Sequence, residues 1–344
     1  MKAIVHRQTT LLSDENALEL IDAPEPELLE HDVLVDVKAV AVNPVDVKVR
    51  ANMAPDGDYR ILGYDAAGVV LKTGSRVSHF KPGDEVYYAG DITRAGSNAE
   101  RQVVDERIVG HKPKSLNFLD AASLPLTTIT AWEILQDCFG LTLQPTASHD
   151  DSHHQGQESL LIIGGAGGVG SILIQLAKQL TNLQVIATAS RPETADWVRQ
   201  MGADRVIDHH QPLNEALSQQ GSVQPRYVAA LTQTQQHFTA IEKLIQPLGH
   251  IAMIDDPGQL DISLLKTKAL TLSWEFMFAR SMHQTKDMIV QQQLLNQLAG
   301  YVDEGLIKPT TNYKAGQLTV DNLLSAHELQ ESAKAIGKTV LTGF

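Results

Sequence analysis

The stretch Leu160-Leu-Ile-Ile-Gly-Gly-Ala-Gly-Gly-Val-Gly-Ser171 decides how the middle of this chain folds. Four apolar residues run directly into glycines and an amphipathic segment follows, which predicts a buried strand, a tight turn and the start of a helix. Gly165, Gly167 and Gly170 have the G-x-G-x-x-G spacing of a dinucleotide-binding turn. Glycine is needed there for the sharp turn, for close approach of a pyrophosphate and for tight packing of helix on strand. The N–H groups that begin the helix then hold the phosphate charge.

The sequence on both sides of the glycines supports this interpretation. A second strand is predicted at 184–188, and between it and the turn a helical apolar stripe runs through Val169, Ile172, Leu173, Leu176, Ala177 and Leu180. A glycine-rich loop that only packs a strand on a helix is the alternative. We take five residues of the turn as cofactor-binding: Gly165, Gly167, Gly168, Val169 and Gly170.

The end of the second strand bears on the choice of nucleotide. Sites for NAD usually place Asp or Glu about 20 residues past the glycines, where it binds the ribose 2′-hydroxyl. This chain has Ala189-Ser190-Arg191-Pro192 instead, and a hydroxyl with a guanidinium suits a 2′-phosphate. Glu193 comes slightly later, where it fits the first turn of the next helix. We therefore expect Ser190 and Arg191 to favour NADPH over NADH, although Arg191 could also be an ordinary solvated loop residue.

Composition excludes several classes of protein. A length of 344 residues suggests two domains, and 43% hydrophobic residues can build sizeable cores. The net charge of −13, without a basic stripe, argues against nucleic acid and anionic membrane as partners. The first residues lack the apolar core of a signal peptide, and no apolar run is long enough to span a bilayer. The single cysteine, Cys138, allows no internal disulfide and fits a buried helical position. We expect a soluble cytoplasmic protein.

The chain changes character twice. Residues 1–125 are rich in short β signals punctuated by glycine and proline, and from 126 strands alternate with helices. Residues 308–344 return to strand, short helix and strand. We expect an α/β protein in which a β-rich domain over 1–125 is completed by 308–344. A doubly wound parallel-sheet domain is expected over 126–307.

Two further segments leave alternatives open. Apolar and polar residues alternate from Leu270 to Phe278, which predicts a strand with one apolar face, late enough in its domain to be a sheet edge. Such an edge must be paired or covered, either by a second copy in a homodimer or by a helix of the same chain. Residues 141–158 are polar and aperiodic and predict a solvated insertion. It contains four residues that could bind a metal adventitiously: His149, Asp151, His153 and His154.

Taken together, these segments resemble the medium-chain dehydrogenase/reductase superfamily along nearly the whole chain. The matching segments besides the glycine turn are Val42-Asn-Pro-Val-Asp46, Ile61-Leu-Gly-Tyr-Asp-Ala-Ala-Gly-Val69, Lys81-Pro-Gly-Asp-Glu-Val86 and Leu124-Pro-Leu-Thr-Thr-Ile-Thr-Ala-Trp132. The chain is most similar to the NADPH:quinone oxidoreductase branch and its zinc-type alcohol dehydrogenase-like subset, through residues 274–282 and 337–344. The resemblance implies a GroES-like catalytic domain and a Rossmann domain.

Zinc is not expected. Zinc-dependent relatives place a cysteine where this chain has Asn43 and a histidine where it has Tyr64, and neither amide nor phenol is a typical zinc ligand. The four-cysteine structural site of such relatives cannot form from one cysteine. A different cluster remains open, with Asp46, Asp65 and His79 as its candidates.

Without a metal the site lacks a Lewis acid for polarising an alcohol or a simple carbonyl. Reduction of a quinone or an α,β-unsaturated carbonyl demands less, because conjugation in the acceptor stabilises the charge once hydride arrives. The resemblance implies that Asn43 lies near the nicotinamide and ribose, and that Tyr64 lines the substrate side and donates a proton or hydrogen bond. Tyr64 could equally be an aromatic packed beside glycines, and Asp46 could only cap the helix that follows Pro44.

The resemblance also implies two further cofactor contacts. Thr130 matches a family threonine near the cofactor, and His209 stands where relatives use a tyrosine against the 2′-phosphate. A buried helical hydroxyl and an ordinary strand-end residue are the alternatives for these two. We therefore predict a metal-free, NADPH-dependent quinone or enone oxidoreductase. Its rivals are a zinc-dependent alcohol dehydrogenase and a non-catalytic NADPH-binding sensor or structural protein, and the sequence identifies neither the acceptor nor dimer versus tetramer.

Overall fold

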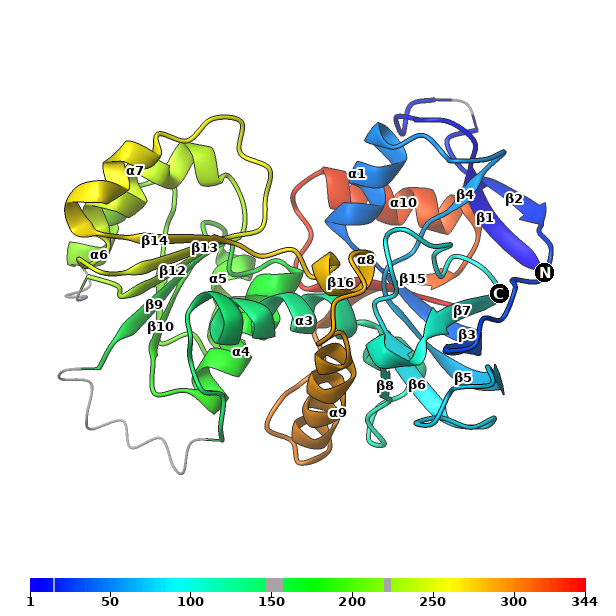
Figure 1. Ribbon diagram of the computed structural model, residues 1–344. Helices are drawn as coiled ribbons and strands as arrows, with labels where there is room; N and C mark the ends of the chain where they lie inside the picture. Colours follow the sequence, from blue (N-terminus) through cyan, green and yellow to red (C-terminus); the bar gives the residue numbers. More distant parts are fainter. Residues whose placement is uncertain (15, 146–156, 220–223) are drawn as a thin grey trace. The chain divides into compact units, whose positions relative to one another are not determined.

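The computed structural model describes residues 1–14, 16–145, 157–219 and 224–344 (Figure 1). These residues form two compact units. The terminal unit comprises Met1–Ile129 and Phe278–Phe344, and the central unit comprises Thr130–Met277. The candidate metal-binding residues of the polar insertion (His149, Asp151, His153 and His154) lie outside the described residues.

The central unit contains a six-stranded sheet in which every neighbouring pair is parallel. Its strand order is β11-β10-β9-β12-β13-β14, so the order reverses between β9 and β12. In doubly wound folds such a reversal marks the place where ligands bind, at the carboxyl ends of the strands. The strands are β9 (Ser159–Ile163), β10 (Gln184–Thr188), β11 (Arg205–Ile207), β12 (Tyr227–Ala230), β13 (His250–Met253) and β14 (Thr271–Trp274).

Helices connect these strands and cover the sheet. All five residues of β9 are buried; Leu161 and Ile163 pack with apolar residues of α6 and α7 in one core. Because side chains alternate along a strand, Leu160 and Ile162 face the other way, and α4 packs against β9 and β10. The predicted doubly wound parallel fold is confirmed. The helices are α4 (Gly168–Leu180), α5 (Pro192–Gln200), α6 (Leu213–Gln219), α7 (Thr234–Leu244) and η3 (Ile262–Lys268).

Among the described strands, β14 forms one edge of this sheet and pairs with β13 alone. The predicted strand over 270–278 is therefore shorter than its alternating pattern, because the strand ends at Trp274. Beyond that residue the alternation fails, since Met277 and Phe278 are both buried although they are neighbours. Trp274 and Phe276 are 59% and 48% exposed, so this edge presents aromatic surface within the chain described.

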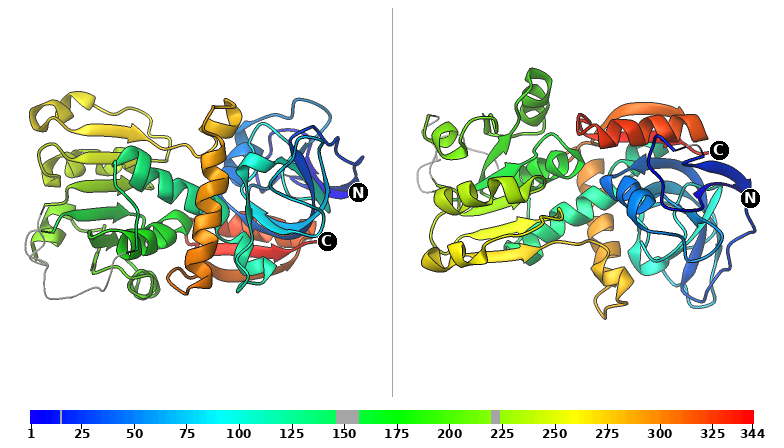
Figure 2. Two further views of the ribbon diagram at one scale, coloured as in Figure 1. Left: turned by 60° about the horizontal axis from the view of Figure 1, so that its bottom comes forward. Right: turned by 90° about the horizontal axis from the view of Figure 1, so that it is seen from above.

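The terminal unit is mainly antiparallel β-structure (Figure 2). Its larger, seven-stranded sheet has the order β15-β16-β3-β5-β6-β8, with β7 also paired to β3, and a three-stranded sheet has the order β2-β1-β4. Together with the parallel sheet, this confirms the α/β class with a GroES-like domain. The strands are β1 (Lys2–His6), β2 (Glu19–Asp22), β3 (Asp32–Val42), β4 (Arg60–Ile61), β5 (Ala66–Thr73), β6 (Glu85–Tyr88), β7 (Arg101–Asp105), β8 (Val109–His111), β15 (Thr311–Gln317) and β16 (Lys338–Thr342).

The C-terminal strand is an inner strand of this sheet, next to the edge strand β15. β16 pairs antiparallel with β3 and parallel with β15, and α10 packs on β15 and α1. This pairing places Lys338, the first residue of β16, near Val42, the last residue of β3. The helical segments of the unit are α1 (Pro44–Asn52), η1 (Glu106–Ile108), α2 (Phe118–Ala122), α8 (Ala279–Met282), α9 (Ile289–Asp303) and α10 (Val320–Glu331).

Helix α9 packs in the terminal unit, which differs from the expected boundary at 307. The Tyr87 hydroxyl donates to the Leu295 carbonyl at 2.6 Å, and the Gln292 amide donates to the Glu106 carbonyl at 2.9 Å. These bonds are long-range in sequence, so periodicity alone could not reveal them. Helix α3 (Pro125–Glu133) crosses the division at Ile129, and the π-helical turn η2 (Ile134–Cys138) continues it. No helix of the described chain is both long enough and apolar enough for a membrane span.

Candidate active site

The glycine turn of the central unit has the geometry that a dinucleotide requires. A Cβ built on Gly170, in the first turn of α4, would lie 2.5 Å from the carbonyl oxygens of Gly164 and Gly165. One on Gly165 would lie 2.8 Å from the Cβ of Ala187 in β10. At Gly167 the nearest atom would be 3.6 Å away. Two glycines thus permit close packing, and the third leaves its Cα exposed to an approaching group.

The turn leads directly into the N-terminus of α4. Gly167 caps this helix, so the first N–H groups after it, from Gly168 and Val169 onward, have no partner within the helix. Gly164 donates its N–H to the Thr188 hydroxyl at 3.0 Å, which ties the turn to the end of β10. Orphan donors at a helix N-terminus suit a pyrophosphate, so these residues fit a dinucleotide.

Ser190 and Arg191 follow β10 at the carboxyl edge of the sheet. Arg191 caps α5, where its N–H donates to the Thr194 hydroxyl at 3.1 Å. Its side chain is 37% exposed, and its Nε lies 3.5 Å from the carboxylate of Glu193, which is in the first turn as expected. An ion pair this exposed is weak.

His209 leaves β11 at the same edge, because Ile207 of β11 is registered with Thr188 of β10. Its ring lies 4.8 Å from that of His210 and 6.5 Å from that of His237, measured between centroids. Burial, with a contribution from His210, lowers the pKa of His209. The ring is therefore neutral unless a phosphate supplies negative charge beside it.

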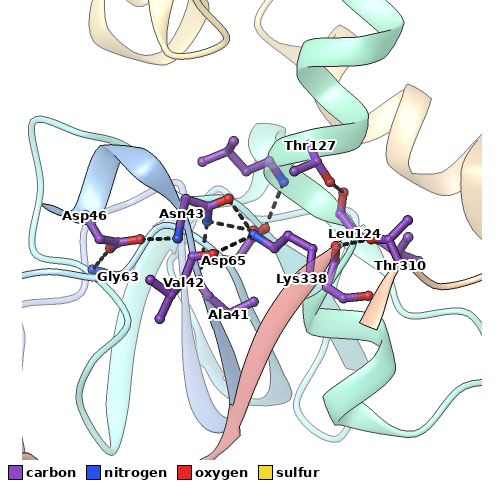
Figure 3. A network of polar contacts seen from close by, with 12 residues as sticks. Ala41, Val42, Asn43, Asp46, Gly63, Asp65, Leu124, Thr127, Thr310 and Lys338 are labelled. Carbon is purple, nitrogen blue, oxygen red and sulfur yellow. Dashed lines mark hydrogen bonds and ion pairs between the residues drawn. The ribbon is translucent and has the colours of Figure 1, made fainter. Parts of the chain in front are cut away.

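Asn43 and Asp46 form a capping box at the start of α1 in the terminal unit (Figure 3). Asn43 N–H donates to one Asp46 carboxylate oxygen at 2.7 Å, and Gly63 N–H donates to the other at 3.0 Å. Burial raises the Asp46 pKa to about 7. The expectation that Asp46 caps the helix after Pro44 is confirmed, and Asp46 also holds the loop containing Gly63.

Lys338 lies at the centre of a buried network beside this box (Figure 3). Its ammonium donates to Asp65 Oδ2 at 2.8 Å, to the Val42 carbonyl at 3.1 Å and to the Asn43 amide oxygen. Asn43 Nδ2 donates to the same Asp65 oxygen at 2.8 Å, and the Leu126 N–H donates to Oδ1 at 2.8 Å. Burial raises the Asp65 pKa, while the ammonium and these donors oppose that shift. All three N–H groups of Lys338 and both oxygens of Asp65 therefore have partners.

These residues do not fit a zinc ion. Asn43 and Tyr64 are not typical ligands, and the oxygens of Asp46 and Asp65 already accept hydrogen bonds. The Lys338 ammonium would also repel a divalent cation at this position. His79, the third candidate, is exposed, and its N–H donates to Glu106. Across the described ranges no group of three or more His, Cys, Asp or Glu side chains could hold a metal.

Tyr64 directly precedes Asp65 and is fully buried. Its ring packs edge-on against Phe278, with centroids 5.5 Å apart. Its hydroxyl has no hydrogen-bond partner among the described residues. Burial, with contributions from Asp46 and Asp91, raises its pKa, so the phenol stays protonated. Tyr64 therefore presents a hydrogen-bond donor that the described chain does not use.

Thr130 lies in α3 and is 3% exposed. Its hydroxyl hydrogen-bonds to Glu275, a buried carboxyl that directly follows β14, and Glu133 lies beside Glu275. Cys138 is half-buried, and burial raises its pKa to about 12, so its thiol is protonated, in keeping with an inert residue.

Sequence reasoning overlooked Lys338 and Glu275. Each carried a signal, because Lys338 is the only charged residue in the sequence 338–342, and Glu275 is the only charged residue in the sequence 270–278. The sequence alone did not identify the partner of each residue, because that partner lies more than 100 positions away along the chain.

Comparisons with known proteins cover both units. Residues 29–114 match the alcohol dehydrogenase GroES-like domain, and residues 201–341 match the zinc-binding dehydrogenases. A zinc-type alcohol dehydrogenase-like protein of Staphylococcus epidermidis is 40% identical over 342 residues, covering 99% of each chain. The 2-methylene-furan-3-one reductase of Solanum lycopersicum is 32% identical over 327 residues, covering 92% of this chain and 73% of its own.

A solved structure agrees with these sequence matches. A Rhizobium etli protein assigned to the zinc-dependent alcohol dehydrogenases superposes with a TM-score of 0.93 at 47% identity, covering 100% of this chain and 98% of its own. The matches extend over the glycine turn, the Asn43 network and the C-terminal strand that carries Lys338. The chain therefore belongs to the medium-chain dehydrogenase/reductase superfamily of oxidoreductases and, within it, to the zinc-type alcohol dehydrogenase-like proteins.

Proposed function

We propose that this protein transfers a hydride from NADPH to a quinone or an α,β-unsaturated carbonyl without a metal ion. The observation that carries the proposal is the Lys338 network beside Asn43 and Tyr64. A cation is needed at the zinc position of a dehydrogenase to polarise an alcohol or carbonyl oxygen. Here the cation is a lysine ammonium whose three donors are already bound within the chain, so it is not available to a substrate.

The other polar groups of the site suit the reduction of a conjugated acceptor. Bound NADPH supplies the hydride. Tyr64 contributes a protonated, unpartnered hydroxyl, which can hydrogen-bond to a carbonyl oxygen as charge develops there or donate a proton to it. Asn43 is held by Asp65 and Lys338, which fix the orientation of its amide for the proposed contact with the cofactor. The similarity to an enone reductase, the tomato 2-methylene-furan-3-one reductase, supports this acceptor class.

The choice of NADPH rests on Ser190, Arg191 and His209. A hydroxyl, a guanidinium and an imidazole at the carboxyl edge of β10 and β11 are groups that a 2′-phosphate recruits. No carboxylate occupies the end of β10 itself, where an NAD site places one. Thr130 and the five residues of the glycine turn complete the proposed cofactor contacts.

We also propose that the protein forms a homodimer through the edge of the central sheet. β14 is an edge strand, and Trp274 and Phe276 expose aromatic surface beside it. Edge strands of this kind require a partner, and a second copy pairing with β14 would supply one. Light scattering of the protein eluting from a sizing column measures its mass directly, and a monomer would contradict this proposal.

The test of the reaction follows NADPH oxidation by the protein after exhaustive treatment with a chelator, using quinones, enones and saturated aldehydes in parallel. Turnover of a quinone or enone, unchanged when zinc is added, is the expected result. Turnover of alcohols or aldehydes that appears only with zinc would replace this proposal with the zinc-dependent alcohol dehydrogenase favoured by the zinc-dependent neighbours. Tight NADPH binding without turnover of any acceptor would instead identify a non-catalytic binding protein.

A further inference from the structure

Helices α4 and α5 are joined by a hydrogen-bond relay of Trp197, Ser171 and Gly167 that ends in the glycine turn. The Trp197 indole N–H, on α5, donates to the Ser171 hydroxyl on α4 at 2.8 Å. That hydroxyl donates in turn to the carbonyl of Gly167, the residue that caps α4, at 2.6 Å. Ser171 is fully buried. Because an indole N–H can only donate, the single hydroxyl hydrogen of Ser171 is left for Gly167.

The Gly167 carbonyl accepts two hydrogen bonds from one residue. The Ser171 N–H donates to it at 2.9 Å as the first bond of the helix, and the Ser171 hydroxyl occupies its second lone pair. The peptide that joins Gly167 to Gly168 is planar and trans, so its N–H points opposite to its C=O. Fixing that carbonyl along α4 therefore directs the Gly168 N–H out of the helix N-terminus, where it has no partner within the helix.

Helix α5 contacts the glycine turn through two consecutive residues. Beside Trp197, Val198 lies close to Gly165, since a Cβ built on that glycine would be 3.3 Å from Val198 Cγ1. The same helix is capped by Arg191, which the proposed function assigns to the 2′-phosphate. The middle of α5 therefore supports the turn, whereas its N-terminal cap is proposed to contact a different part of the dinucleotide.

We propose that Trp197 and Ser171 are positioning residues for the pyrophosphate of a bound dinucleotide. Trp197 orients the Ser171 hydroxyl, and Ser171 holds the peptide whose N–H is directed at the phosphate oxygens. Because NADPH and NADH share the pyrophosphate, the relay contributes equally to the binding of both. This inference rests on the proposed function only in placing a dinucleotide at the glycine turn.

The relay is tested first on cofactor-free protein, by the nuclear magnetic resonance signals of the indole N–H groups. The chain has three tryptophans, and the signal lost in Trp197→Phe identifies Trp197. Ser171→Ala should shift that signal upfield, because the indole loses its acceptor. Trp132→Phe is the matched control and should leave the signal in place, since the Trp132 indole is also buried and donates to Gln136 at 3.1 Å. A Trp197 signal that does not move in Ser171→Ala would overturn the inference.

The positioning role is tested by titration calorimetry with NADPH, NADH and adenosine 2′-phosphate, which lacks the pyrophosphate. Ser171→Ala should raise the Kd of both dinucleotides by about 5-fold, the loss expected for one neutral hydrogen bond, and leave that of adenosine 2′-phosphate unchanged. Trp197→Phe should raise both by about 3-fold. The double variant should match Ser171→Ala, because Trp197 acts through Ser171. Trp132→Phe should change none of the three values.

Three results would overturn the positioning role. They are equal dinucleotide affinity in Ser171→Ala and wild type, a loss of adenosine 2′-phosphate affinity in Ser171→Ala as large as that of NADPH, and a double variant in which the two single effects multiply. The readout is binding and not turnover. A wild type that reduces no quinone or enone would therefore contradict the proposed function, while the loss of dinucleotide affinity in Ser171→Ala would still support this inference.

Discussion

Asp65 in the terminal unit and Glu275 in the central unit are both carboxyls buried to 5% exposure or less, yet they are stabilised by opposite means. Asp65 has an ammonium at 2.8 Å and accepts further bonds from an amide and a backbone N–H. Glu275 has another carboxyl and a hydroxyl. The first site satisfies a charge by pairing it, whereas burial and the neighbouring acid raise the pKa of Glu275 and favour its neutral form.

Asp46 falls between these two cases. It is 1% exposed and accepts two backbone N–H bonds, but no cation of the described chain bonds to it directly. Burial raises its pKa only to about 7. The three residues show that burial alone does not decide the protonation of a carboxyl: the number and charge of the donors around it do.

The strongest test of the comparison between Asp65 and Glu275 is to remove the Lys338 ammonium. Lys338→Met should lower the free energy of unfolding by about 3–5 kcal/mol, because it leaves Asp65 buried without its counter-charge. Asp65 should then take up a proton. Urea denaturation measures the loss, and infrared spectroscopy should detect an additional protonated carboxyl.

The double variant Asp65→Asn with Lys338→Met is the control for that prediction. It removes both charges and should recover most of the lost stability. A single Lys338→Met variant as stable as wild type would mean that the ion pair is not what holds β16 against β3.

The second-largest expected effect is the pH dependence that Asp46 gives to the free energy of unfolding. Its folded pKa of about 7 exceeds its ordinary value of 3.8, so the folded state binds a proton that the unfolded state has released. The stability that this proton contributes is present at low pH and is lost as pH rises from about 4 to about 7, by up to ~4 kcal/mol. Asp46→Asn should abolish this decline when unfolding is measured across that window.

The comparison must be made between wild type and Asp46→Asn, because His327 acts in the opposite direction. Burial, with Arg50 nearby, lowers the His327 pKa to about 3, so its contribution is lost as pH falls below about 6.5. Subtracting the free energies of unfolding of the two proteins at each pH cancels the contribution of His327 and leaves that of Asp46. Parallel curves for the two proteins would show that Asp46 is ionised in the fold at all these pH values.

The sequence predicts the framework of this protein well and its buried polar clusters poorly. The parallel sheet and the glycine turn follow from local patterns, in which each strand and helix carries its own periodicity. The capping role of Asp46 was also predictable, because a capping box is a pattern within four consecutive residues. Lys338 with Asp65 and Glu275 with Thr130 are different, since their partners meet only after the chain has folded.

The end of β14 shows a further limit of pattern reading. Alternation from 270 to 278 predicted one long strand, but the strand stops at Trp274 and the chain crosses into the terminal unit at Phe278. Alternation reports which residues are apolar, and it cannot say whether the same neighbour covers all of them. The compact units also group α9 with the terminal unit, an assignment that depends on long-range contacts and not on the periodicity of the helix.

The next prediction concerns Tyr64. Its buried hydroxyl has no hydrogen-bond partner among the described residues, whereas all three donors of Lys338 are bound. Tyr64→Phe should lower kcat/KM for an enone by about 100-fold, through loss of a hydrogen-bond or proton donor in the transition state. Stability should change little, since no bond within the described chain is lost. Tyr227→Phe is the matched control, as its hydroxyl bonds to Glu158 at 3.2 Å in the central unit, and its kcat/KM should stay near wild type. A fully active Tyr64→Phe would leave Tyr64 as a packing residue.

Arg191 extends the comparison from buried cations to an exposed one, with the smallest expected effect. Lys338 is 3% exposed and fully bonded, whereas Arg191 is 37% exposed and pairs with Glu193 at 3.5 Å. Arg191→Ala should raise the Kd of NADPH by about 10-fold while leaving that of NADH unchanged, because only NADPH carries the 2′-phosphate. Arg199→Ala, which removes a more exposed arginine paired with Asp196 on the same helix, should change neither Kd. Equal weakening of both nucleotides by Arg191→Ala would indicate that Arg191 supports the start of α5 rather than the phosphate.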